Sequence, residues 1–455
     1  MHKAKAALIV ILLPCILPRI RHPFPTGGLV DFGPYYTAAV LARTHQGAAI
    51  YYGADAGGDP QHVFAVEQCD ALSECSPQGS LFARTAQSQG IPPPLLYLYP
   101  PTLADLLIPL TFFQFSVASK LWTAINYATL PITSLLIARI LRLKLLGLGF
   151  IAVLVSIFSF SPVLQGIATG QVVVLLLLLW TCGAFFYVKN WHIAAGFVLA
   201  LATSIKLTPL IVVIPLLLWK EFKLLAAFVL TLLLLCVAIC FVNSPDCLLD
   251  FFTHVLPAMS AGILTRTNAS FSVSIERVFA MAHHQHLAVG LVNQVSMPVL
   301  LLGKVCSAAV LLAASVLVYS GSPERESASR VKTITLFAIL SVCISPVSWG
   351  HGYCQCFLAL CLLWEQALRQ QISGRRLAIL FLCTLGLTTY LTRYILAASW
   401  IGSHPLTASL GLLLLPLSGV VLLLTELWAM RYSGFSIGTQ RRSPVHTPQV
   451  AETIS

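Results

Sequence analysis

Charged side chains are scarce in this 455-residue chain. Asp, Glu, Lys and Arg make up 9% of it, whereas roughly a quarter of the residues of a soluble protein are charged, and 57% of its residues are hydrophobic. This composition predicts a protein that crosses a membrane several times and excludes an ordinary soluble protein. Acids are scarcer than bases, so the net charge is +11. Because the bases lie mostly in short loops between apolar segments, where they fix orientation in the membrane, we expect no nucleic-acid partner.

Several common signatures are also missing. No small-x-small cleavage site follows the apolar segment Ala6–Leu17, so we interpret it as an uncleaved first span that leaves the N-terminus in the cytoplasm. Asp55 and Asp59 do not form a tight Asp-x-Asp pair, and the histidines of segment 283–286 (HHQH) have no carboxylate or thiolate at ligand spacing. We therefore expect no metal site and no cofactor.

The apolar segments predict an all-α bundle of about twelve transmembrane helices. Two of them, on either side of Lys206, are shorter than the ~20 residues that a helix needs to cross a bilayer. The expected spans are Ala6–Leu17, Leu121–Ile137, Leu145–Pro162, Val172–Val188, Ile193–Ser204, Leu207–Trp219, Leu224–Val242, Val295–Tyr319, Thr333–Ser345, Cys354–Leu368, Leu377–Ala398 and Leu406–Met430.

The proline-rich segment Ile91–Phe115 is apolar but is not counted among these spans. Its prolines remove backbone donors and disfavour a continuous helix. Such backbone persists at membrane depth only where protein or a water-filled cavity covers it. We therefore expect a re-entrant or juxtamembrane segment that returns to the outer face. With this assignment, every Lys/Arg cluster between spans lies on the cytoplasmic side, apart from Arg19 and Arg21.

This threading predicts one polytopic membrane domain over residues 1–430, with outer loops at about 21–117 and 243–293. Residues 431–455 are polar and rich in Ser, Thr and Pro, which predicts a disordered cytoplasmic tail. Both termini are then cytoplasmic, and the polar motifs face the outside of a cell membrane. The absence of an inverted repeat argues against a secondary transporter.

Asp31 is the acid that the outer side presents first. A carboxylate beside the hydrocarbon stays charged easily, whereas the same group inside it costs several kcal/mol. Asp31 is therefore placed where a carboxylate can act as a base on a substrate that arrives from the lipid. The alternative is that Asp31 only caps a helix along the membrane surface, since Asp is a favoured N-cap residue.

Six motifs follow one another along the chain. They are DFGPYYTAA from residue 31, YPPTLADLLIPL from 99, TGQVVVLLLLLW from 169, KLTPLIVVIPLLLW from 206, NASFS from 268 and SPVSWGHGY from 345. In this order they resemble glycosyltransferase family 87, enzymes of the GT-C architecture that use polyprenyl-phosphate sugars. Two positions depart from the family pattern: Ala269 stands where we associate Gln with the family, and His351 is followed by Gly352 in place of a second histidine.

The resemblance implies a GT-C-type membrane glycosyltransferase. It would move a hexose, with mannose as the first expectation, from a polyprenyl-phosphate donor to a lipid or glycan acceptor on the outer face, with inversion. It implies that Asp31 is the general base. Contacts to the donor phosphate or substrate are expected from Lys206, His351, Gln171, Tyr35, Tyr36, Asn268, Trp349 and Arg266.

Four of these residues also have an alternative interpretation. Lys206 either binds an anion in a cavity or snorkels to the interface. His351 either orients a phosphate or a sugar hydroxyl, or is simply solvated in a short loop. Gln171 either donates to a sugar or satisfies a helix end. Asn268 begins an Asn-x-Ser sequon, which is an acceptor for N-glycosylation in a eukaryotic secretory pathway.

A multi-pass transporter or lipid flippase is the rival class. Ion-coupled transporters usually carry acids at the membrane midplane. Here Glu365 and Glu426 lie near cytoplasmic ends of the expected spans, and the midplane is nearly free of acids. The distribution of acids therefore favours the enzyme.

Overall fold

The computed structural model describes residues 29–51, 81–91, 97–260, 296–320, 327–369, 374–388 and 418–422, with 263–264, 268, 270, 272–273, 275–276, 293–294 and 424. Several sequence-based expectations lie outside these residues: the first span, Arg266, the acids at 55 and 59, the HHQH segment and the tail from residue 431.

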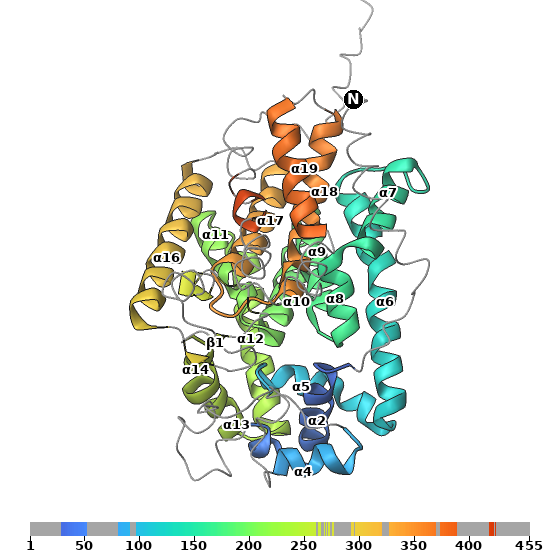
Figure 1. Ribbon diagram of the computed structural model, residues 1–455, viewed down its shortest axis with the longest axis vertical. Coiled ribbons are helices and arrows are strands. Elements are labelled where there is room, and N and C mark those ends of the chain that lie inside the picture. The colour runs from blue at the N-terminus through green and yellow to red at the C-terminus, as the bar shows by residue number, and fades with distance from the viewer. Residues whose placement is uncertain are drawn as a thin grey trace, which may run out of the picture.

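The first described elements form a layer of short helices (Figure 1). They are α2 (Phe32–Arg43), the 3₁₀ turn η1 (Gly47–Ala49), α4 (Leu81–Ser88), α5 (Pro101–Leu107) and the 3₁₀ turn η3 (Ile108–Phe112). Helix α2 packs against α4, α5 and η3. As its prolines predict, the described part of the proline-rich segment forms a short α-helix and a 3₁₀ turn instead of one long helix.

The rest of the described chain is helical apart from one antiparallel pair of two-residue strands, in which Ile263 lies opposite Gln294. The elements are α6 (Phe115–Ile140), α7 (Leu148–Ser159), α8 (Ser161–Thr169), α9 (Val173–Val188), α10 (His192–Ile205), η4 (Thr208–Val212), α11 (Val213–Leu218), α12 (Phe222–Val242), α13 (Pro245–Asp250), the π-helical turn η5 (Phe251–Val255), α14 (Leu256–Ser260), β1 (Ile263–Leu264), β2 (Asn293–Gln294), α16 (Met297–Ser320), α17 (Ser327–Cys343), the 3₁₀ helix η6 (Gly350–Cys356), α18 (Phe357–Arg369) and α19 (Gly374–Thr388).

Three helices of the described part, α6, α12 and α16, are long and apolar enough to cross a membrane. Helices α7 and α8 would make a fourth span if they are taken together, but they are bent by 47°. The sequence predicts a span over Leu145–Pro162, and the break lies at Phe160, close to the predicted end of that span. The break arises because Pro162 lies in the first turn of α8, where proline favours the start of a new helix. The chain is thus a helical membrane protein, and the twelve-span count stays a prediction.

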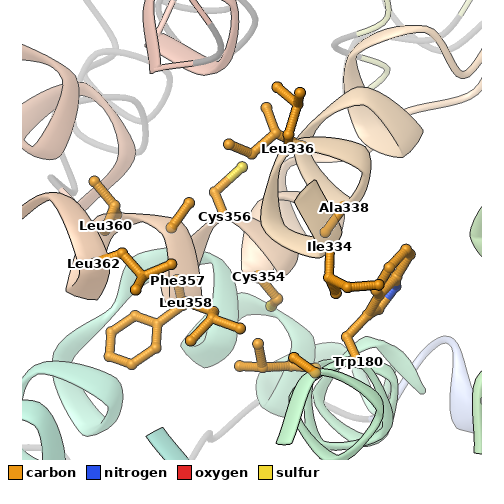
Figure 2. Close-up of a cluster of buried hydrophobic side chains, with 14 of the residues drawn as sticks. Trp180, Ile334, Leu336, Ala338, Cys354, Cys356, Phe357, Leu358, Leu360 and Leu362 are labelled. Carbon is orange, nitrogen blue, oxygen red and sulfur yellow. The ribbon is translucent and has the colours of Figure 1, made fainter. Parts of the chain in front are cut away.

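The larger core surrounds α9. Trp180 of α9 lies beside Ile334 of α17, and Cys354 of η6 and Leu358 of α18 belong to the same cluster (Figure 2). Lipid tails are as apolar as these side chains, so close van der Waals packing stabilises the cluster more than removal from water does. This core ties the middle helices to the SPVSWGHGY segment.

A second, aromatic core lies under α2. The ring of Phe32 stacks on Trp122 of α6 at 5.7 Å and on Phe115 at 6.0 Å between centroids. Tyr35 meets Tyr99 edge to face at 5.0 Å. Because α2 begins at Phe32, this core fixes the position of the residue before it, Asp31.

Candidate active site around Asp31

Asp31 occupies the N-cap position of α2 without capping it. Its side chain makes no hydrogen bond to the first turn of the helix. Its backbone N–H instead donates to the carbonyl oxygen of Thr169, at the end of α8, at 2.9 Å. The residue as a whole is half-buried. The capping interpretation therefore has no hydrogen bond to support it, and the carboxylate is directed toward the α8–α9 junction.

That junction requires glycine at position 170. Gly170 ends α8 with φ at 77°, in the left-handed region, and a Cβ there would lie 2.8 Å from Cβ of Phe32. Its carbonyl oxygen accepts a hydrogen bond from the indole of Trp122 at 2.8 Å. The close approach of Gly170 to Phe32 brings the start of α2 next to Gln171, the residue after Gly170.

Gln171 is buried and joins two tyrosines to Asp31. Its side-chain oxygen accepts hydrogen bonds from the hydroxyls of Tyr35, at 2.6 Å, and Tyr99, at 2.7 Å. Its side chain is also hydrogen-bonded to the carboxylate of Asp31, as is that of Thr169. The interpretation that Gln171 only satisfies a helix end therefore omits its main contacts.

The surroundings of Asp31 act on its pKa in opposite directions. Burial raises the pKa of the carboxyl above its ordinary value, and this effect is the largest. The hydrogen bonds from Gln171 and Thr169 and the positive charge of Lys206 favour the ionised form and oppose the increase. The result is a carboxylate that is more basic than an exposed one, as a general base requires.

Lys206 follows the end of α10, where the backbone becomes extended. Its ammonium lies 5.9 Å from the centre of the Tyr99 ring, within the range of a cation–π contact. Burial lowers its pKa to about 8, and the negative charge of Asp31 partly offsets that decrease. The acid and the lysine therefore belong to one site, although they are far apart in sequence.

His351 approaches the same site from η6. It is 5% exposed, and its Nε2 has no hydrogen-bond partner among the described residues. Burial, helped by the charge of Lys206, lowers the pKa of the imidazole to about 3, so the ring is neutral at physiological pH. A buried polar atom without a partner is costly, which makes this nitrogen a candidate contact for a substrate oxygen. The solvated-loop interpretation of His351 is wrong, because the ring is enclosed.

Asn268 and Trp349 hold the segment that carries His351. They form an isolated antiparallel bridge, and the side-chain oxygen of Asn268 accepts hydrogen bonds from the backbone N–H groups of Ser270 and Ser348, each at 3.0 Å. Trp349 lies against the ring of His351 at 5.8 Å. Asn268 is completely buried, so it is not placed as an exposed glycosylation acceptor. Its contacts hold the SPVSWGHGY segment in place.

Tyr36 does not join this group, because its hydroxyl donates to the carbonyl oxygen of Phe113 at 2.6 Å. Arg266 lies outside the described residues. Our sequence reasoning did not single out Tyr99 and Thr169, although both begin motifs that we quoted. Their positions next to Gln171 and Asp31 depend on tertiary contacts, and no local pattern reports them. No group of three or more His, Cys, Asp and Glu side chains able to hold a metal occurs in the described part of the chain.

The structure is that of a helical membrane protein. It brings an acid, a lysine and a histidine together at one largely buried polar site. The model of glycosyltransferase family 87 matches residues 97–346, which is more than half of the chain, and the chain belongs to this family. The resemblance drawn from the six motifs is confirmed.

A curated relative is the polyprenol-phosphate-mannose-dependent alpha-(1-2)-phosphatidylinositol pentamannoside mannosyltransferase of Mycobacterium tuberculosis (strain CDC 1551 / Oshkosh). The chain is 25% identical to it over 281 residues. The aligned region spans 60% of this chain and 60% of the relative.

Proposed function

We propose that this protein transfers a hexose, with mannose as the first candidate, from a polyprenyl-phosphate donor to a glycolipid acceptor, with inversion. The observation that carries the proposal is the carboxylate of Asp31, which caps no helix and shares its site with Lys206. The family supports the reaction class, and the printed name of the mycobacterial relative supports the donor and the sugar. No cofactor takes part in the proposed reaction.

Asp31 is the base in this proposal. The acceptor hydroxyl attacks the anomeric carbon, its proton passes to the carboxylate, and the bond from that carbon to the phosphate oxygen breaks. A carboxylate within hydrogen-bond reach of the hydroxyl is suited to this transfer. Burial makes the group more basic, which favours proton removal near neutral pH.

Lys206 and His351 bind the donor phosphate in this proposal. The leaving group is a polyprenyl phosphate, which gains negative charge as the bond breaks, and a cation close to it stabilises that charge. The ammonium of Lys206 supplies the charge, and Nε2 of His351, which has no partner among the described residues, supplies a hydrogen bond when it carries the proton. A neutral histidine next to a lysine adds a donor without charge repulsion.

The proposed arrangement in the membrane is the GT-C-type bundle expected from the sequence. The site would face the outside of the cell membrane, both termini would be cytoplasmic, and donor and acceptor would reach the site from the lipid. Only 17% of the most apolar 18 residues of α12 and 22% of those of α16 are buried. Their exposed apolar faces are suited to contact with lipid.

The test is the substitution Asp31→Asn in purified protein. Polyprenyl-phosphate mannose serves as the donor and phosphatidylinositol mannosides as acceptors, and release of polyprenyl phosphate is measured together with donor affinity. An amide cannot take the proton, and positioned acid-base groups supply ~10²- to 10⁴-fold in rate. Turnover should fall by at least about 10²-fold while donor binding persists.

Asp31→Glu is the matched control. It keeps the carboxylate but displaces it by one methylene, so we expect partial activity. If Asp31→Asn turns over at more than about a tenth of the wild-type rate, Asp31 is not the base. A variant that has lost both turnover and donor binding has misfolded, so the two measurements together separate catalysis from folding.

A further inference from the structure

Gln171 has more hydrogen-bond partners than a helix-end residue requires. We propose that Gln171 is a positioning residue, which orients the carboxylate of Asp31 through a side-chain amide that Tyr35 and Tyr99 hold in one orientation. The inference rests on the proposed function, because it needs Asp31 to be the base. It assigns a role to three buried residues that neither supply charge nor touch the reacting atoms.

The two tyrosines determine which way the amide faces. A carbonyl oxygen has two lone pairs, and here both are used by hydroxyl donors, Tyr35 at 2.6 Å and Tyr99 at 2.7 Å. An amide nitrogen is a donor only, so it cannot take the place of the oxygen between two hydroxyl donors. The nitrogen must therefore lie on the other side, from which it donates to the carboxylate of Asp31.

Burial keeps this arrangement rigid. Gln171 is 3% exposed, Tyr35 2% and Tyr99 6%. The two tyrosine rings pack edge to face with their centroids 5.0 Å apart, and the centroid of the Tyr97 ring lies 6.3 Å from each of theirs. A side chain this enclosed is poorly placed to touch a sugar, so its contact with Asp31 is the one that bears on the reaction.

The other groups that face Asp31 define what loss of Gln171 would change. These groups are the ammonium of Lys206, the hydroxyl of Thr169 and the phenols of Tyr35 and Tyr99. A hydrogen bond to the ionised form lowers the pKa of a carboxyl. Without the amide donor, Asp31 would keep its burial and lose part of what offsets it, so its pKa would rise.

The test is the pH dependence of kcat/KM, whose acid limb reports the base of the free enzyme. Gln171→Leu removes the donor, and Gln171→Glu keeps an acceptor for both tyrosines but replaces the donor with a second carboxylate. In both variants the acid limb should move to higher pH by about one to two units, which is the size expected for loss of a hydrogen bond to a charged acceptor.

The tyrosines provide a second test that leaves Gln171 in place. Tyr35→Phe and Tyr99→Phe should each have a small effect, because the remaining hydroxyl still donates to the amide oxygen of Gln171 and keeps the amide in the same orientation. The double variant should shift the acid limb by more than the two single shifts together. Tyr97→Phe is the control: it loses a buried hydroxyl of the same cluster, which bonds Pro100 and Ala104, and should leave the acid limb unchanged.

The outcomes separate this inference from the proposed function. Activity that survives in Asp31→Asn overturns the proposed function. An inactive Asp31→Asn together with an unmoved acid limb in both Gln171 variants overturns only the positioning role and leaves Gln171 as a packing residue. If Gln171→Leu does not fold, the double phenylalanine variant decides, and additive single shifts there count against the inference.

Discussion

Lys206 shows how burial sets the range of pH in which one charge can work. Enclosure beside Tyr99 lowers its pKa to about 8, although Asp31 lies near enough to oppose that decrease. An exposed lysine would stay charged at any physiological pH. This one loses its proton just above neutrality, so its capacity to hold an anion depends on pH.

Donor affinity should therefore fall in alkaline solution. A phosphodiester donor keeps one negative charge throughout, so the loss of charge falls on Lys206. Below pH 8 the lysine is protonated and binding is at its strongest, and above pH 8 affinity should drop by up to about tenfold per pH unit. Binding of polyprenyl-phosphate mannose at pH 6.5 to 9.5 measures this dependence.

Two variants test the assignment to Lys206. Lys206→Arg keeps its charge at every pH used, so the alkaline loss should disappear even if affinity is lower overall. Lys206→Met should bind the donor weakly at all pH values while it expresses nearly normally. Unchanged donor affinity in Lys206→Met would mean that the lysine has a structural role.

The ionisable residues of the site could be predicted from the sequence, whereas their hydrogen-bond and ring partners could not. Asp31, Lys206 and His351 stand out in the sequence because ionisable groups are rare in apolar surroundings. The contact of Tyr99 with both Gln171 and Lys206 leaves no such trace. A buried tyrosine in an apolar motif resembles any other core aromatic residue until the fold brings it to a polar neighbour.

At the scale of elements, one pair of side chains joins the proline-rich segment to the end of α12. The side-chain amide of Asn243 donates to the carboxylate of Asp105 in α5. Gly47 of η1 makes room for this pair, because a Cβ there would lie 2.4 Å from Cβ of Asn243. Burial raises the pKa of Asp105 to about 6, and the hydrogen bond from Asn243 opposes that increase.

The raised pKa of Asp105 predicts a pH dependence of stability. Between its usual value of 3.8 and about 6, the folded chain keeps a proton that the unfolded chain has released. The free energy of unfolding therefore falls as pH rises through this window. Asp105→Asn removes the ionisation, so its Tm relative to wild type should be higher at pH 7 than at pH 4.

Thermal unfolding in detergent at the two pH values measures the effect. Asp246→Asn is a matched control, because Asp246 is an exposed acid close to the same end of α12. Its Tm relative to wild type should be the same at pH 4 and pH 7. An equal Tm difference between Asp105→Asn and wild type at both pH values would contradict the prediction.

The apolar runs predicted most helices of the bundle but not the break between α7 and α8. Long runs such as those of α12 and α16 identify helices by composition alone. The bend at Phe160 arises from one proline two residues later, within an apolar segment of suitable length for a span. Whether such a proline bends a helix or begins a new one depends on the neighbours that satisfy the freed backbone groups.

For the whole molecule, the one-sided Lys/Arg clusters predict orientation. Single cysteines at positions 55 and 285 should react with a membrane-impermeant reagent from outside intact cells, whereas cysteines at 142 and 375 should not. The wild-type chain gives the background from its own cysteines. Labelling of position 142 from outside would mean that the proline-rich segment crosses the membrane, and the orientation would invert from there onward.

The hydrogen bond between Tyr35 and Gln171 joins residues 136 positions apart. At about 5–20 residues per second, a ribosome needs roughly 7 to 27 s to make the chain between them. During that interval Asp31 in the nascent chain lacks both the amide of Gln171 and the carbonyl oxygen of Thr169 that accepts its backbone N–H. Asp31 therefore acquires these two partners only after residue 171 has been made, and a shorter nascent chain contains the acid without the geometry that would make it reactive.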